Sequence, residues 1–179
     1  MMMTWRSTPI PDEEAFAAIK AGIDSLPPGV KVFLNSGARP SLTSSVCRSV
    51  ALTLVTTGEF YGQNLTTGNL ELLARFFEKY PEYADRSFLS VKGGLVPGQV
   101  TPDGSRENLR RSVDTILKAL RGTKRLDLFQ PARRDPNYEI EHYAEVLNEM
   151  VREGKFDHIG LSEVRAETVR AAHKVRRLF

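Results

Sequence analysis

Apolar and polar positions follow two periods along this chain, and together they predict alternating strands and helices. Apolar residues recur at helical spacing over residues 12–23, 69–80, 106–120, 139–153 and 166–176. Short apolar runs bounded by turn residues predict strands over residues 30–34, 88–92, 126–130 and 158–162. Asp12 and Ser105 are the expected N-caps of the first and third helices.

The order of these elements predicts an α/β domain. Strand and helix alternate four times, which is typical of parallel βαβ units. The 179 residues suffice for one domain with a sizeable core, whereas a complete (β/α)8 barrel typically needs about 250 residues. The alternation alone leaves open whether the sheet is part of a barrel or an open doubly wound sheet.

Composition and charge place the chain among ordinary globular proteins, with 41% hydrophobic and 26% charged residues. Cys47 is the single cysteine, so an internal disulfide is excluded and a reducing compartment fits. The N-terminus lacks the apolar core of a signal peptide, and no stretch approaches the roughly 20 apolar residues of a membrane span. We therefore expect a cytoplasmic protein without membrane contact.

The net charge of +3 includes basic clusters at residues 121–134 and 165–177. Such clusters can attract anions, although solvated helix faces and loops explain them as well. A nucleic-acid-binding helix over residues 165–177 is a rival interpretation. Single-strand sites usually add stacking aromatic residues. Residues 165–179 offer only Phe179, so we expect no nucleic-acid partner.

The spacing of the predicted strands is uneven. Strand starts near residues 31, 88, 126 and 158 give intervals of about 57, 38 and 32 residues. Removing residues 38–58 would shorten the first interval to about 36. This segment has no Asp or Glu; it begins after Gly37 and ends at Gly58. We interpret residues 38–58 as an insertion, such as a translated intron, which sequencing of the transcript would test.

Tyr61 and Lys92 are candidates for acid–base chemistry. Reduction of a carbonyl needs a hydride at carbon and a proton at oxygen, and a tyrosine can donate that proton if its pKa falls from its ordinary value of about 10. A lysine ammonium in contact lowers a phenol pKa by about 1–3 units. The two residues meet only if both lie at the carboxyl ends of neighbouring strands. The alternative is a surface tyrosine and an edge lysine with no shared task.

Four motifs resemble the aldo-keto reductase family, most closely the fungal pyridoxal reductases. Without the insertion, residues 35–37 and 59–62 join as N-S-G-E-F-Y-G. The others are F-L-S-V-K-G-G at 88–94, L-D-L-F-Q-P-A-R-R-D-P at 126–136 and G-L-S-E-V at 160–164. Their order resembles strands two to five of that family. The resemblance covers nearly all of the chain outside residues 38–58. It implies a partial (β/α)8 TIM barrel of about four βα units, with residues 1–179 as one incomplete oxidoreductase domain.

The resemblance also implies a reaction, the NADPH-dependent reduction of an aldehyde or ketone to an alcohol, such as pyridoxal to pyridoxine. Tyr61 would be the proton donor and Lys92 the partner that lowers its pKa. Asn35 falls where most members have an aspartate that pairs with the lysine. Ala132 falls where most members have a histidine. Pyridoxal reductases are similar to this chain at both of these positions. No metal is implied.

Three further residues are implied as ligand contacts. Ser162 matches a serine that contacts the nicotinamide carboxamide, and Glu163 lies where an asparagine is usual. Arg133 follows the third predicted strand, where loop residues can touch substrate. Ser162 could instead cap the next helix, and Arg133 could form a salt bridge at the loop mouth.

The family barrel has eight strands. The resemblance implies that the first strand is absent here or reduced to residues 1–5, and that strands six to eight are absent. The later strands supply most of the cofactor contacts in the family. Two open strand edges and an apolar face would remain, which pairing with a second copy would cover. The expected partner is therefore a small aldehyde, with a homo-oligomer as a second expectation. The alternative function is a non-catalytic, truncated fragment that binds no cofactor.

Overall fold

Four parallel strands lie side by side in chain order in the computed structural model, which describes residues 4, 8–35, 58–60 and 63–176. The strands are β1 (Val32–Asn35), β2 (Ser87–Gly93), β3 (Leu128–Pro131) and β4 (His158–Ile159). The helices are α1 (Asp12–Asp24), α2 (Gly68–Lys79), α3 (Arg106–Leu120), α4 (Ile140–Arg152) and α5 (Ala166–Arg176), with 3₁₀ turns η1 (Gln63–Leu65) and η2 (Pro81–Tyr83). Within the described part of the chain, no helix is long and apolar enough to cross a bilayer.

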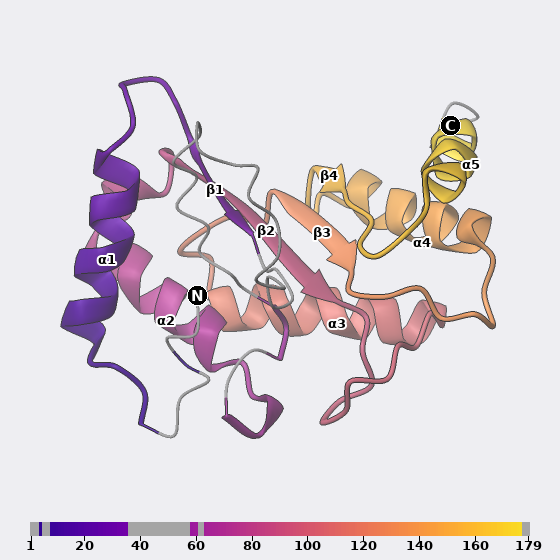
Figure 1. The fold of residues 1–179 in the computed structure, drawn as a ribbon, viewed down its shortest axis with the longest axis horizontal. Helices are drawn as coiled ribbons and strands as arrows, with labels where there is room; N and C mark the ends of the chain where they lie inside the picture. The colour runs from indigo at the N-terminus through magenta and orange to yellow at the C-terminus, as the bar shows by residue number, and fades with distance from the viewer. Residues whose placement is uncertain (1–3, 5–7, 36–57, 61–62, 177–179) are drawn as a thin grey trace, which may run out of the picture.

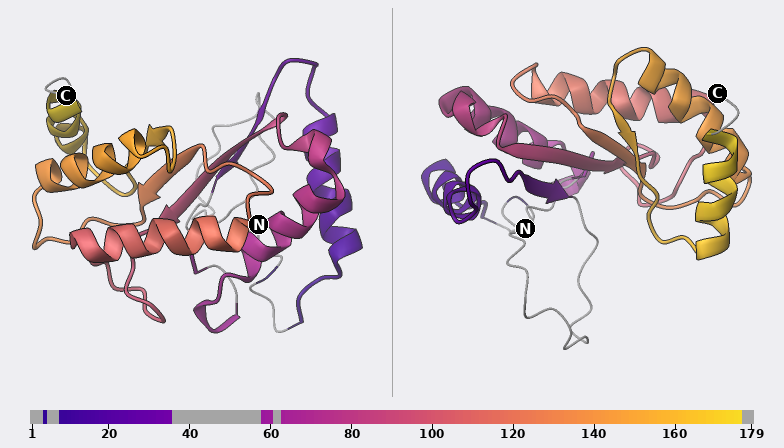
Figure 2. Two further views of the ribbon diagram at one scale, coloured as in Figure 1. Left: turned by 180° about the vertical axis from the view of Figure 1, so that it is seen from behind. Right: turned by 90° about the horizontal axis from the view of Figure 1, so that it is seen from above.

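The strand order gives this sheet the character of a barrel segment. Each strand pairs in parallel with the next one along the chain, without the reversal of order that marks a doubly wound sheet. Helices α2, α3 and α4 follow one another along one side of the sheet, and α1 lies beside α2 (Figure 1, Figure 2). The α/β class and the βα units predicted from the sequence are confirmed, and the sequential order favours a barrel.

The side of the sheet that faces the helices forms the hydrophobic core. Leu34, Leu89, Val91 and Phe129 alternate toward this side and are fully buried. They belong to one cluster with the apolar faces of α1 to α4. Burial of each such side chain contributes about 1.5–3 kcal/mol relative to exposure, so the amphipathic helices and the sheet stabilise each other.

The opposite side of the sheet is only partly covered by the residues that the structure describes. Phe33 of β1 stacks on Phe88 of β2 with ring centroids 5.1 Å apart, and Phe88 stacks on His158 of β4 at 5.6 Å. Both phenylalanines are half-buried, and His158 is exposed. In a closed barrel, inward side chains from all strands fill this space. These four strands therefore present a barrel-interior face that remains partly open.

The structure corrects two predictions, the cap of the first helix and the end of the fourth strand. Asp12 is not the cap of α1, which begins after Pro11; its carboxylate instead accepts hydrogen bonds from Arg75 Nε at 2.6 Å and Nη2 at 2.8 Å. The strand predicted over residues 158–162 ends at Ile159, because only two residues pair with β3. Ser105 is confirmed as the cap of α3, accepting a hydrogen bond from the amide of Asn108 at 3.3 Å.

The register of the sheet bears on the insertion predicted over residues 38–58, most of which lies outside the described residues. β1 pairs Asn35 with Ser90, so a strand continued by two residues would place position 37 opposite Lys92. The residue that bridges to Lys92 is Gly58. Gly58 thus occupies the sheet position that an uninterrupted strand would give to Gly37, which agrees with the insertion hypothesis.

Deleting residues 38–58 is therefore expected to leave the sheet intact. The deletion joins Gly37 directly to Glu59 and supplies the same backbone group opposite Lys92. We expect a chain with unchanged helical circular dichroism and no loss of Tm. Deleting residues 58–78, the same length but including most of α2, is the matched control and should abolish cooperative unfolding. A large loss of Tm in the 38–58 deletion would contradict the insertion hypothesis.

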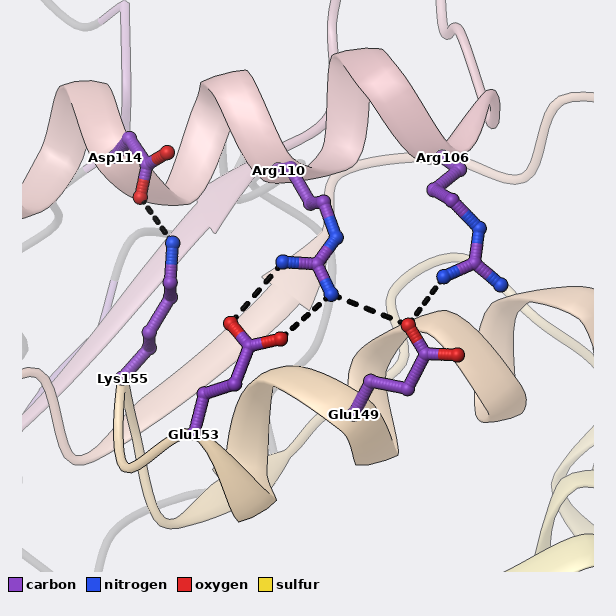
Figure 3. A network of polar contacts seen from close by, with 6 residues as sticks. All are labelled: Arg106, Arg110, Asp114, Glu149, Glu153 and Lys155. Carbon is purple, nitrogen blue, oxygen red and sulfur yellow. Dashed lines mark hydrogen bonds and ion pairs between the residues drawn. The ribbon is translucent and has the colours of Figure 1, made fainter.

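A row of ion pairs joins α3 to α4 and its following turn (Figure 3). Arg110 donates to both oxygens of Glu153, at 3.0 and 2.7 Å, and to Glu149 at 3.1 Å. Arg106 also contacts Glu149, and Lys155 pairs with Asp114 at 2.5 Å. Arg106, Arg110 and Asp114 recur every four residues on α3 and so share one helix face. The row fixes the two neighbouring helices at their exposed seam.

Arg110→Met is expected to lower Tm by a few degrees at pH 7, because it removes the shared partner of two carboxylates. The hydrogen bonds from Arg106 and Arg110 hold the pKa of Glu149 below its ordinary 4.5, and Arg110 does the same for Glu153. A lowered folded-state pKa gives stability above pH 4.5 that is lost as the pH falls through the folded value. The Tm deficit should therefore shrink in acid. Lys118→Met, exposed on the same helix, is the control; a deficit independent of pH would contradict the ion-pair explanation.

Candidate functional site

The predicted site residues that the structure describes gather at the carboxyl edge of the sheet. Lys92 lies one residue before the end of β2, Arg133 follows β3 and Ser162 follows β4. Parallel strands end on the same side, and in (β/α)8 barrels this side carries the active site. The prediction that Lys92 stands at the carboxyl end of its strand is confirmed.

Lys92 and Ser162 are in direct contact. The Lys92 Nζ donates a hydrogen bond to the Ser162 Oγ at 2.8 Å, although the residues are 70 positions apart. Ser162 is buried and Lys92 is half-buried. Burial lowers the pKa of the Lys92 ammonium from its ordinary 10.5; the Glu163 carboxylate opposes this shift, and the Arg133 cation adds to it. The structure thus holds a partly desolvated cation beside a hydroxyl.

Further polar side chains lie next to this contact, on the side of the sheet that faces away from the helices. Gln130 of β3 is the register partner of Lys92, and its Nε2 donates to the Oγ of Ser90 on β2 at 2.8 Å. Both residues are buried. Side chains two residues apart on a strand share a face, so Ser90 and Lys92 point the same way. The hydrogen bond cross-links β2 and β3 directly beneath the lysine.

Arg133 and Glu163 form an ion pair beside the lysine. The Arg133 Nε donates to Glu163 Oε2 at 3.0 Å, and about half of each side chain is exposed. This contact is the loop-mouth salt bridge that the sequence left open for Arg133. Ser162, by contrast, does not serve the next helix in any contact described for it; its hydroxyl accepts from Lys92. An exposed pair of this kind is weak and can exchange partners.

The two other predicted catalytic residues are placed only in part. Tyr61 lies outside the described residues. Asn35 is the last residue of β1, opposite Ser90. Gly58 pairs with Lys92. Tyr61 lies three residues after Gly58 in the sequence, so it follows a backbone position that is held beside the lysine. The prediction that Tyr61 contacts Lys92 stays a prediction.

Glu59 is a buried polar residue that is not among the site residues predicted from the sequence. It is only 2% exposed, and it contacts Arg111 and Ser112 of α3. A carboxylate within an otherwise apolar and aromatic motif, G-E-F-Y-G, was the available signal. Its partners lie more than 50 positions along the chain, where no local pattern points to them.

Comparison with known proteins agrees with the motifs in the sequence. The model of the aldo/keto reductase family matches residues 41–178. The chain is 49% identical over 115 residues to "Probable pyridoxal reductase 2" of Schizosaccharomyces pombe, an alignment that covers 64% of this chain and 34% of that protein. It is 34% identical over 176 residues to an uncharacterized oxidoreductase of the same species, covering 98% of this chain and 45% of that protein. The chain thus spans less than half the length of these relatives.

Proposed function

Because the chain belongs to the aldo/keto reductase family, we propose that it reduces the aldehyde pyridoxal to the alcohol pyridoxine with NADPH. The family also identifies the sheet as part of a (β/α)8 barrel, as the sequence motifs predict. The observation that carries the proposal is the hydrogen bond from Lys92 to Ser162 at the carboxyl edge of that barrel segment. It brings together a pKa-tuning cation and a hydroxyl suited to hold a nicotinamide.

In the proposed reaction, Tyr61 donates its phenolic proton to the carbonyl oxygen of the aldehyde. The Lys92 ammonium stabilises the phenolate that remains, and so it lowers the pKa of the phenol toward the working pH. Asn35 would orient the lysine through its amide oxygen without adding negative charge. Burial of Lys92 strengthens its effect, because a charge acts more strongly where water is partly excluded.

The residues beside Lys92 fit the carboxamide of a nicotinamide. A primary amide carries one acceptor oxygen and an NH₂ donor. The Ser162 hydroxyl accepts from Lys92, which leaves its own hydrogen to donate to that oxygen, and the Glu163 carboxylate can accept from the NH₂. When bound, NADPH supplies the hydride that the carbonyl carbon receives. The chain's own contribution is to hold the amide and to deliver the proton.

Two observations support pyridoxal as the substrate. The relative with 49% identity is named a probable pyridoxal reductase, and Ala132 leaves out the histidine side chain that most of the family presents to the carbonyl. Pyridoxal carries an acidic ring hydroxyl, and the half-exposed Arg133 guanidinium at the site mouth is the proposed partner for it. The contact would replace the pairing of Arg133 with Glu163.

The test is the pyridoxal-dependent oxidation of NADPH, followed at 340 nm with the purified chain after circular dichroism shows that it is folded. We expect saturable NADPH binding by fluorescence titration and turnover that depends on pyridoxal. A folded chain that binds no NADPH and oxidises none would contradict the proposal. That result would favour the non-catalytic alternative.

A further inference from the structure

The backbone just before Tyr61 is fixed from two directions. Gly58 bridges to Lys92, and the amide of Glu59 donates to the Lys92 carbonyl oxygen at 2.7 Å. From the other side, Asn69 of α2 donates its Nδ2 to the Gly58 carbonyl oxygen at 2.8 Å and is itself buried. The strand that carries Lys92 and helix α2 therefore hold this segment between them.

The Glu59 side chain adds a third attachment, to helix α3. Its Oε1 accepts a hydrogen bond from Arg111 Nη1 at 2.5 Å, and its Oε2 accepts one from the Ser112 hydroxyl. With only 2% of the residue exposed, an unpaired carboxylate here would be strongly destabilising. Both oxygens are paired, so the carboxylate has one well-defined position.

The partners of Glu59 are tied in turn to the chain that follows Lys92. The Ser112 Oγ accepts a hydrogen bond from the Gly94 amide at 2.9 Å, and Arg111 Nη2 donates to the Leu95 carbonyl oxygen at 2.9 Å. One buried carboxylate thus connects the segment before Tyr61, helix α3 and the turn after Lys92. Gly58, Glu59, Asn69, Arg111 and Ser112 together are called the Glu59 clasp.

Close packing fixes the geometry of the clasp. A Cβ added at Gly93 would overlap the Ser112 Oγ, would lie 2.7 Å from Phe129 Cε2 and would come within 3.2 Å of Glu59 Oε2. The end of β2 approaches α3 this closely only because position 93 has no side chain. The clasp therefore has little freedom to adjust if one of its hydrogen bonds is lost.

We propose that Glu59 is a positioning residue, which acts through Arg111 and Ser112 to set the place of Tyr61 relative to Lys92. The inference rests on the proposed function, in which these two residues form the proton-donating pair. Glu59 itself touches neither the aldehyde nor the cofactor in this account. Its role is to hold the chain two residues before the phenol at the fixed edge of β2.

Glu59→Gln tests this role, because it keeps the side-chain shape and removes the charge-assisted pairing with Arg111 and Ser112. The measurement is the pKa of Tyr61, taken as the difference in phenolate absorbance between each chain and its Tyr61→Phe counterpart. We expect the pKa of Tyr61 to rise by about 1 unit or more in Glu59→Gln, as contact with Lys92 is lost. Turnover should fall at least 10-fold in kcat, with a smaller change in KM.

The direction of the shift separates positioning from simple electrostatics. Removing a buried negative charge, with the Arg111 and Lys92 cations left in place, would by itself lower the pKa of a nearby phenol. A rise therefore reports a displaced Tyr61. Glu153→Gln is the matched control, since it also removes a carboxylate that is paired with an arginine of α3, and it should leave the pKa of Tyr61 unchanged.

The outcomes distinguish this inference from the proposed function. If the parent chain shows a lowered pKa for Tyr61 and Glu59→Gln leaves or lowers it further, the positioning role is overturned while the proposed function stands. If the parent chain shows an ordinary pKa for Tyr61, both are overturned. Ser112→Ala provides a second, milder variant if Glu59→Gln does not fold, and a smaller rise in the same direction is expected.

Discussion

Lys92→Met is expected to lower kcat for pyridoxal reduction by about 10²–10⁴-fold while the chain stays folded. Lys92 is the only residue of the proposed proton-donating pair whose position the structure describes, and its Nζ lies 2.8 Å from the Ser162 Oγ. Methionine fills a similar volume but supplies no charge, so the phenol of Tyr61 would return toward its ordinary pKa near 10. Without the lysine charge, the phenolate that remains after proton donation would be less stable, and proton transfer to the carbonyl oxygen would be slower.

The control for this variant is Lys79→Met, which changes a half-exposed lysine on α2. It should keep kcat and Tm close to those of the parent. Turnover in Lys92→Met within a few fold of the parent would contradict the assigned role. The pH profile gives a second check, because Lys92 acts only as a cation and burial lowers its pKa from 10.5. The kcat of the parent should therefore decline as the pH rises through that lowered pKa.

Tyr61→Phe is expected to cause a loss of similar size, about 10²–10⁴-fold in kcat, because it removes the only proton that the account assigns to the carbonyl oxygen. The substitution deletes one oxygen and leaves the aromatic ring, so NADPH affinity should change little. Background reduction, in contrast, would not respond to this change. Steady-state kinetics with pyridoxal and an NADPH titration of the same preparation distinguish turnover that depends on Tyr61 from background reduction.

Tyr138→Phe is the matched control for Tyr61→Phe. Tyr138 lies in the turn after β3, where its ring stacks on His142 with centroids 4.7 Å apart, and the account gives its hydroxyl no part in the reaction. Equal losses of kcat in both variants would indicate that kcat responds to any tyrosine near this edge. That result would contradict the role of Tyr61 as the proton donor.

The helices could be predicted closely because their signals are local. The third predicted helix, residues 106–120, coincides with α3, since Ser105 caps it and a strong amphipathic period runs through it. The second, predicted over residues 69–80, differs from α2 by one residue at each end. The strands were predicted less well. β3 begins at Leu128 rather than at residue 126, because strand ends depend on pairing with a neighbour and not on the apolar run alone.

The site was predictable where one motif carries both a strand and its functional side chain. An apolar run that ends in Lys92-Gly93-Gly94 placed the lysine at the carboxyl edge. The contact of Lys92 with Ser162 was not predicted, because the two residues are 70 positions apart in the sequence. The partners of Glu59 could not be expected at all, since they join the chain across more than 50 positions without any periodic signal.

Hydride transfer from NADPH deuterated at C4 of the nicotinamide is the decisive measurement for the proposed reaction. The folded parent chain is incubated with pyridoxal, and the alcohol product is analysed by mass spectrometry. We expect pyridoxine that is one mass unit heavier, with the signal lost in Lys92→Met and in Tyr61→Phe. Folded parent chain that transfers no deuterium, or variants that transfer it as fast as the parent, would contradict the account.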